Sequence, residues 1–318
     1  MSRLFFIGKL FNGKLIATIL GVLIIFFIAQ FFIQQWRLIQ HHTVQVDYRL
    51  IVVGMLIYSL FLCFQGIYWR QIMSSVGQRV TWLTALYFYL NAALLSYIPG
   101  KVANIWGVSA IARSENISKS IAVTALILSQ LYAVISGALV MGLCWFFVKP
   151  GIRGNIPFVL TTLLLFLVLM GLVVLSPRFI SGLFKVLSGI LKRDVIKIKV
   201  LYRAHLINIA FYFVAWALLS FSVFCLANSF GERMPLNVLP SIGFILIASY
   251  IVTLLAFFVP AGLGIIEFGL LYGFSFIYPA PQALSVSVTY RIMALLAIFI
   301  VYFAILALKK AARWRFPV

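Results

Sequence analysis

Hydrophobic residues fall along this chain in eight long runs, and two of the runs are interrupted by proline and glycine. The six uninterrupted runs each have about the 20 residues that a helix needs to cross a bilayer. They lie near residues 15–34, 50–69, 120–148, 156–176, 204–228 and 283–308. The remaining two, 82–112 and 240–278, are each broken near the middle. This pattern predicts an all-α polytopic membrane protein with about six full transmembrane helices and two broken segments.

The two breaks resemble each other in composition and lie about half a chain length apart. The first reads Tyr97-Ile98-Pro99-Gly100-Lys101, and the second reads Pro260-Ala261-Gly262-Leu263-Gly264-Ile265-Ile266-Glu267. Apolar pieces follow at 102–112 and 265–277. Eleven helical residues span about 16 Å, roughly half of a 30 Å hydrocarbon core. We therefore expect each broken segment to form a re-entrant hairpin, the kind of discontinuous helix that builds transport sites.

Basic residues give the orientation of this arrangement. Lys and Arg are concentrated near the N-terminus, in 177–203 and at the C-terminus, and such regions usually remain in the cytoplasm. Suppose that the N-terminus is cytoplasmic and that each hairpin returns to the side from which it entered. Counting the crossings then places all three basic regions in the cytoplasm. The hairpins then enter from opposite faces, as in an inverted-topology repeat with halves of about 1–155 and 156–318. The charges fit equally if the return pieces cross fully.

Composition supports a single integral membrane domain over 1–318. Hydrophobic residues make up 64% of the chain and charged residues 9%, and the mean hydropathy is +1.15. No polar stretch is long enough for a separate soluble domain. The first run is too long for a signal peptide and is expected to be a retained helix. Segment 178–199 has apolar residues at helical spacing beside lysine and arginine, which predicts an amphipathic helix at the cytoplasmic interface.

The formal net charge of +20 has two explanations. Juxtamembrane lysine and arginine are usual in membrane proteins, and they also attract anionic headgroups. Alternatively, the protein handles an anionic or phosphate-bearing lipid. Nucleic acid binding is not expected, because no basic domain lies outside the membrane. The three cysteines lie in apolar runs without metal-ligand spacing, so neither a metal nor a cofactor is expected, and no nucleophile–base pair indicates an enzyme.

Two charged residues lie deep in apolar sequence and are the main candidates for function. Glu267 follows Gly264 by three residues, where a half-helix would begin and its dipole would favour a carboxylate. It would handle substrate or protons, cap the amides freed by the break, or do both. Arg291 lies about eight residues inside its run and should pair with an acid. A Glu267–Arg291 pair is expected, with either a structural or a substrate role.

Lys101 directly follows the first break. Its ammonium group could bind a phosphate together with free amides near Gly100, or it could extend to the interface. The predicted substrate-binding and translocation residues are Pro99, Gly100, Lys101, Pro260, Gly262, Gly264, Glu267 and Arg291. Arg113 and Glu115 are expected at the interface. Trp69, Trp82, Trp106, Trp145 and most tyrosines are expected to form aromatic belts at the membrane surfaces.

These motifs resemble the membrane domain of the lysylphosphatidylglycerol synthase and flippase family. The family pattern is Pro-Gly-Arg/Lys in the first half, then Pro-Gly-Gly-Leu-Gly-x-x-Glu and a later Arg, which correspond here to the two breaks and Arg291. Ala261 replaces a glycine of that pattern. Val102-Ala103-Asn104 stands where some relatives have a Gly-Glu pair. The soluble acyltransferase-like domain of the full synthases is not found in these 318 residues.

The resemblance implies lipid translocation without the synthetic step. The expected substrate is an anionic or phosphate-headed lipid, either an aminoacylated phospholipid or a polyprenyl-phosphate-linked sugar. The alternative is a non-transporting accessory or scaffold subunit of a membrane glycosyltransferase or cell-envelope lipid pathway. Partners could then include a second copy of the chain or such a glycosyltransferase. The expected location is the prokaryotic plasma (inner) membrane, with both termini in the cytoplasm.

Overall fold

The computed structural model of the protein describes residues 45–97, 101–115, 117–148, 153–154, 202–255 and 259–315. Helices dominate these residues, and their only β-type pairing is an isolated bridge between Val46 and Phe230. The α-helices are α3 (Tyr48–Ser75), α4 (Trp82–Leu95), α5 (Lys101–Ser114), α6 (Lys119–Trp145), α10 (Tyr202–Ala227), α11 (Leu239–Leu255), α12 (Ile265–Phe274) and α13 (Ala280–Arg315). Two short 3-10 turns are η1 (Leu236–Val238) and η2 (Pro260–Gly262). The all-α polytopic prediction is confirmed.

Within the described ranges, five helices are long and apolar enough to cross a membrane. Four of them, α3, α6, α10 and α13, correspond to predicted full spans. The fifth is Leu236–Leu254, the first limb of the second broken segment, which is long enough by length and composition to cross by itself. The predicted spans 15–34 and 156–176 and the amphipathic helix 178–199 lie outside the described residues.

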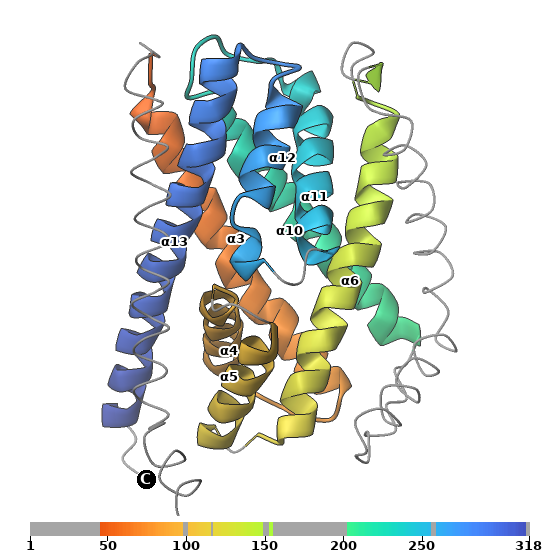
Figure 1. Cartoon of the computed structure of the whole chain (residues 1–318). Coiled ribbons are helices and arrows are strands. Elements are labelled where there is room, and N and C mark those ends of the chain that lie inside the picture. The colour runs from red at the N-terminus through yellow and green to blue at the C-terminus, as the bar shows by residue number, and fades with distance from the viewer. Residues whose placement is uncertain are drawn as a thin grey trace, which may run out of the picture.

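The two broken segments form two short helical hairpins that enter the bundle from opposite ends. Helices α4 and α5 lie side by side in the lower half of Figure 1, and α11 and α12 lie side by side in the upper half. The long helices α3 and α13 run past both hairpins (Figure 1). Each broken segment therefore forms a pair of neighbouring helices, as expected from the breaks. Re-entry into the membrane and the repeat relation between residues 1–155 and 156–318 remain predictions.

The outer faces of the long helices are apolar. On α3, Leu56 and Leu60 are 62% and 57% exposed, and on α13 Phe303 is 63% exposed. A water-soluble protein of this size would bury such a series, whereas lipid tails solvate it without cost. These faces are therefore the lipid-contacting surface, which agrees with an integral membrane protein.

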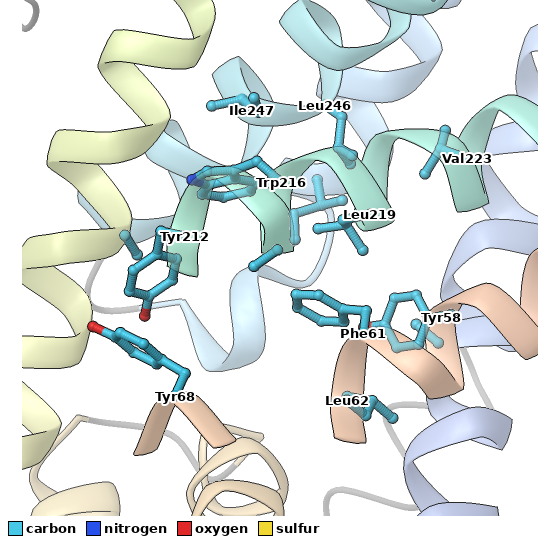
Figure 2. Packing of buried hydrophobic residues seen from close by; sticks show 14 of the residues in the cluster. Tyr58, Phe61, Leu62, Tyr68, Tyr212, Trp216, Leu219, Val223, Leu246 and Ile247 are labelled. Carbon is cyan, nitrogen blue, oxygen red and sulfur yellow. The ribbon is translucent and has the colours of Figure 1, made fainter. Parts of the chain in front are cut away.

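Aromatic and branched side chains line the space between α3, α10 and α11. Figure 2 shows Tyr58 and Phe61 of α3 on the side toward Leu219 of α10, and Tyr68 of α3 opposite Tyr212 of α10, with ring centroids 4.3 Å apart. Helices α3 and α10 approach closely at Gly54, where Ser222 donates a hydrogen bond of 2.8 Å to the glycine carbonyl. Small residues of this kind let membrane helices pack at short range. This packing holds α3 and α10 around the centre of the bundle.

Glycines also determine how closely α11 and the second break with α12 can pack. A Cβ atom added at Gly262, Gly269 or Gly273 would lie 2.0–2.4 Å from side-chain atoms of Thr253, Ser249 or Ile245. All three of those neighbours are on α11, so the glycines form a seam along the hairpin. The sequence singled out Gly262 as a site residue, and the structure shows that its lack of a side chain is a packing requirement.

Candidate functional site

The second chain break contacts the chain just before the first break. The backbone N–H of Ala261, in the second break, donates a hydrogen bond of 2.8 Å to the carbonyl oxygen of Ser96, just before the first break. Three positions in the second break have positive φ: Ala261 at 45°, Gly262 at 65° and Gly264 at 83°. This backbone turns the chain from α11 into α12 and leaves peptide groups outside helical hydrogen bonding.

Glu267 lies in the first turn of α12 and uses both carboxylate oxygens. Its Oε2 accepts the backbone N–H of Gly264 at 2.8 Å, and its Oε1 accepts Nε–H of Arg291. Its backbone carbonyl accepts the hydroxyl of Ser287 at 2.7 Å. Only 6% of Glu267 is exposed. The residue therefore caps the helix after the glycine break and forms the predicted ion pair with Arg291, whereas its role in handling substrate or protons remains a prediction.

Arg291 joins both breaks. It lies eleven residues after the start of α13, or about 17 Å along the helix axis. Its Nη1 lies 3.3 Å from both the hydroxyl of Tyr97 and the carbonyl oxygen of Ala261, and its Nη2 lies 3.3 Å from the carbonyl oxygen of Gly262. The guanidinium is thus bound to the first break through Tyr97 and to the second through two backbone carbonyls. Removing it would leave these acceptors and a buried carboxylate without their donor.

A cavity of about 400 Å³ opens beside this junction. Its volume lies within the range of small-molecule sites. Its aromatic lining comprises Tyr58, Phe61, Trp69, Tyr89, Tyr97, Tyr212, Trp216, Tyr250 and Tyr290. Its other polar lining comprises Gln65, Ser96, Ser129, Gln130, Thr253 and Arg291. Figure 2 shows part of this wall, where Tyr58 and Phe61 of α3 lie across from Trp216 and Leu219 of α10.

Several of these cavity residues were not anticipated from the sequence. Trp69 was expected in a membrane-surface belt, and that prediction is wrong: the side chain is 2% exposed and lines the cavity. Tyr97 was part of the first motif but was not predicted to bind. Gln65 is 4% exposed, and its Oε1 has no hydrogen-bond partner among the described residues. An unpartnered buried acceptor costs about 1–3 kcal/mol, so the cavity favours an occupant that donates a hydrogen bond.

The remaining predicted residues are placed as follows. Pro260 and Gly262 form η2, and Gly264 is the N-cap of α12. Lys101 begins α5, but its side chain lies outside the described part of the chain, as do Pro99 and Gly100. The structure therefore brings Gly262, Gly264, Glu267 and Arg291 together and leaves the first-break residues as a prediction.

A second ion pair lies at the lower end of the bundle. Lys309 of α13 contacts Glu115, just after α5, with 2.5 Å between Nζ and Oε1, and both side chains are 17% exposed. The ammonium of Lys309 also lies 4.3 Å from the ring centroid of Tyr87. Neither charged residue lines the cavity. Helix α13 therefore carries an ion pair to each hairpin.

Comparison with known families agrees with this architecture. A family model described as the lysylphosphatidylglycerol synthase TM region matches residues 14–301, which include both breaks and Arg291. The chain belongs to this family. A comparison with curated proteins found no match to the chain. Membership in the lysylphosphatidylglycerol synthase TM family associates the chain with a membrane domain in lipid-related function.

One departure from the family pattern has a structural cost. Ala261 stands where the pattern has glycine, and its φ of 45° lies in the left-handed region that glycine prefers. A non-glycine residue there costs about 1–2 kcal/mol. The sequence does not reveal this cost, because the backbone conformation of Ala261 appears only in the structure. The hydrogen bond from Ala261 to Ser96 and the contact of its carbonyl with Arg291 stabilise the strained conformation.

Proposed function

We propose that this protein is a flippase-type transporter that moves a lipid with an anionic or phosphate-bearing headgroup across the bilayer. The observation that carries the proposal is the position of Arg291, a buried cation that lines the central cavity and binds both chain breaks. Buried charges in membrane segments are expensive and usually serve substrate or ion pathways. A membrane lipid is the partner that such a cavity fits.

The geometry supports a specific role for each hairpin. Helix α12 begins at the cavity with its positive dipole end, where the guanidinium of Arg291 pairs with the carboxylate of Glu267. A phosphate would bind at this point, while its acyl or prenyl tails remain in the lipid. Lys101, with Pro99 and Gly100, would add donors from the first break. Movement of one hairpin against the other would then open the cavity to each side in turn.

The family membership supports a lipid-related role. Basic residues support an orientation with both termini in the cytoplasm, because they gather near 3–14, in 177–203 and at the C-terminus. In a prokaryote this would place the protein in the plasma membrane. The cavity then lies between the leaflets at a depth that a headgroup must pass during translocation.

A reconstitution experiment tests the proposal. The full chain is inserted into liposomes with a fluorescent lipid that carries a phosphate headgroup, and its transbilayer movement is followed by quenching. The double variant Glu267→Gln/Arg291→Met should insert but move lipid at the protein-free rate. The matched control is Glu115→Gln/Lys309→Met, which removes an ion pair away from the cavity and should retain transport.

The same experiment separates transport from an accessory role in a glycosyltransferase pathway. An accessory subunit would move no lipid in any of the liposomes. It would also rescue a deletion strain when Glu267, Arg291 and Lys101 are all neutral. That combination of results would refute the transporter proposal, whereas loss of both transport and rescue in the Glu267/Arg291 variant would support it.

A further inference from the structure

Tyr97 is the last described residue before the first break, and it contacts Arg291. Its hydroxyl accepts Nη1–H of Arg291 at 3.3 Å, and the guanidinium carbon lies 6.0 Å from the centre of its ring. The tyrosine is 7% exposed and lines the cavity. An occupant of the cavity can therefore contact Tyr97, which in turn contacts the buried ion pair of Arg291 with Glu267.

The contact of Tyr97 with Arg291 is long compared with the bonds that Glu267 makes. The carboxylate of Glu267 accepts the N–H of Gly264 at 2.8 Å, and its carbonyl oxygen accepts the hydroxyl of Ser287 at 2.7 Å. Hydrogen bonds from nitrogen to oxygen usually measure about 2.7–3.2 Å, and weaken as they lengthen. At 3.3 Å, the bond from Arg291 to Tyr97 has room to shorten.

Tyr97 also lies where two closely packed units of the bundle meet. Helix α4, which ends just before Tyr97, packs tightly on α3: a Cβ atom added at Gly66 of α3 would lie 2.7 Å from the Cβ atom of Leu86. On the other side, Glu267 of α12 is paired with Arg291 of α13. The hydroxyl of Tyr97 therefore connects the unit of α3 and α4 to the unit of α12 and α13.

The hydroxyl of Tyr97 can pass on the effect of an occupant because it both accepts and donates hydrogen bonds. Toward Arg291 it is the acceptor, so its own proton is available to an acceptor group in the cavity. Hydrogen bonds in such a chain polarise and strengthen one another. Arg291 is already paired with Glu267, so the occupant meets an electrically neutral pair, and the effect passes through directed hydrogen bonds and not through a net charge.

We propose that Tyr97 is a positioning residue that draws the two breaks together when an acceptor group, such as a phosphate oxygen, occupies the cavity. This inference rests on the transport function proposed above and adds a regulation of the same site. With the cavity occupied, a continuous chain of hydrogen bonds runs from the occupant through Tyr97 and Arg291 to Glu267. The hairpins are then held together while the headgroup is bound, and the link loosens when it leaves.

The rate of cross-linking between the breaks measures this effect. The backbone N–H of Ala261 bonds to the carbonyl oxygen of Ser96 at 2.8 Å, so the pair Ser96→Cys/Ala261→Cys reports on the junction. The full chain with this pair, and without its native cysteines, is oxidised in detergent with and without dioctanoyl phosphatidate. Phosphatidate should raise the initial rate about threefold, as expected of one strengthened hydrogen bond. Dioctanoylglycerol, which lacks the phosphate, should leave the rate unchanged.

Two tyrosine variants separate this role from a purely structural one. Tyr97→Phe keeps the ring and removes the hydroxyl, so it should abolish the response, although phosphatidate should still raise the melting temperature of the protein. The matched control is Tyr302→Phe, which removes another long hydroxyl contact between α13 and α4, 3.4 Å to Asn91. Tyr302 is not part of the described lining of the cavity, so this variant should keep the response.

The outcomes distinguish this inference from the proposed function. An equal response in Tyr97→Phe and its parent would overturn the inference, as would loss of the response in both tyrosine variants. Phosphatidate that raises the melting temperature of the parent without changing its cross-linking rate would also overturn it, while leaving the transporter proposal intact. A response that depends on Tyr97, without lipid movement in liposomes, would support the link between the breaks and refute transport.

Discussion

Neutralising Glu267 and Arg291 one at a time and together tests how the centre of the bundle is stabilised. Both side chains are almost fully buried, at 7% and 6% exposed. Glu267→Gln leaves a buried guanidinium without its counter-ion, and Arg291→Met leaves a buried carboxylate. Breaking a buried pair in this way costs about 3–5 kcal/mol. Each single variant should therefore be strongly destabilised.

The double variant should be destabilised much less than the two single variants combined. It retains no unpaired charge, and the glutamine that replaces Glu267 could still accept the N–H of Gly264. What it loses are the hydrogen bonds from Arg291 to Tyr97 and to the carbonyls of Ala261 and Gly262. At about 1 kcal/mol for each bond, the double variant should lose no more than about 3 kcal/mol. The coupling between the two substitutions is then at least about 3 kcal/mol, near the upper end of measured pairs.

Thermal unfolding of the four purified forms measures these differences. At roughly 2–3 °C per kcal/mol for a chain of this size, the single variants should melt roughly 6–15 °C below wild type. The double variant should melt no more than about 9 °C below it, by the same conversion. Single variants that melt within a degree of wild type would show that the pair contributes nothing. A double variant that loses the sum of the two would show that the residues do not interact.

Three further changes give expected outcomes. Ala261→Gly should raise the melting temperature, because it removes about 1–2 kcal/mol of left-handed strain. Gly262→Ala should lower the melting temperature, because its new Cβ would collide with Thr253 of α11. The opposite order of the two melting temperatures would contradict the backbone described here. In a background without native cysteines, the pair Ser96→Cys/Ala261→Cys should cross-link on mild oxidation. The direct backbone hydrogen bond between the two residues puts them within reach of a disulfide. Absence of the cross-link would argue that these two segments do not meet. Glu115→Gln should lower the free energy of unfolding by less than about 2 kcal/mol, because solvent screens the partly exposed pair of Glu115 with Lys309. A loss as large as that of the Glu267 variant would refute this expectation.

The hairpins could be predicted because the signals for them are local. Proline and glycine in an apolar run mark a break wherever the chain goes, and the limb lengths follow from residue counts. Helix α5 was predicted at 102–112 and occupies Lys101–Ser114, and α12 begins at the predicted Ile265. The pair between Glu267 and Arg291 could also be predicted, since a buried acid in a membrane needs a partner and few cations lie nearby.

The cavity could not be predicted because its walls come from distant parts of the chain. Trp69, Tyr212 and Tyr290 have the spacing of ordinary apolar helix residues, and aromatic residues in membrane proteins are most often at the interface. Only the packing of α3 against α10 and α13 turns them inward. The pairing of Glu115 with Lys309, 194 residues apart, was missed for the same reason. Gln65 gave no sequence signal, because its unsatisfied oxygen appears only when its neighbours are known.

The ion pair at the junction also determines how the membrane potential acts on the protein. One elementary charge that crosses the full potential exchanges about 2.3 kcal/mol per 100 mV with the field. Glu267 is on α12 and Arg291 is on α13, so motion that separates them would do electrical work, whereas motion that carries them together would do none. The backbone contacts that tie Arg291 to the second break favour joint motion. The voltage dependence of the proposed transport would then report the charge of the lipid headgroup and not that of the protein.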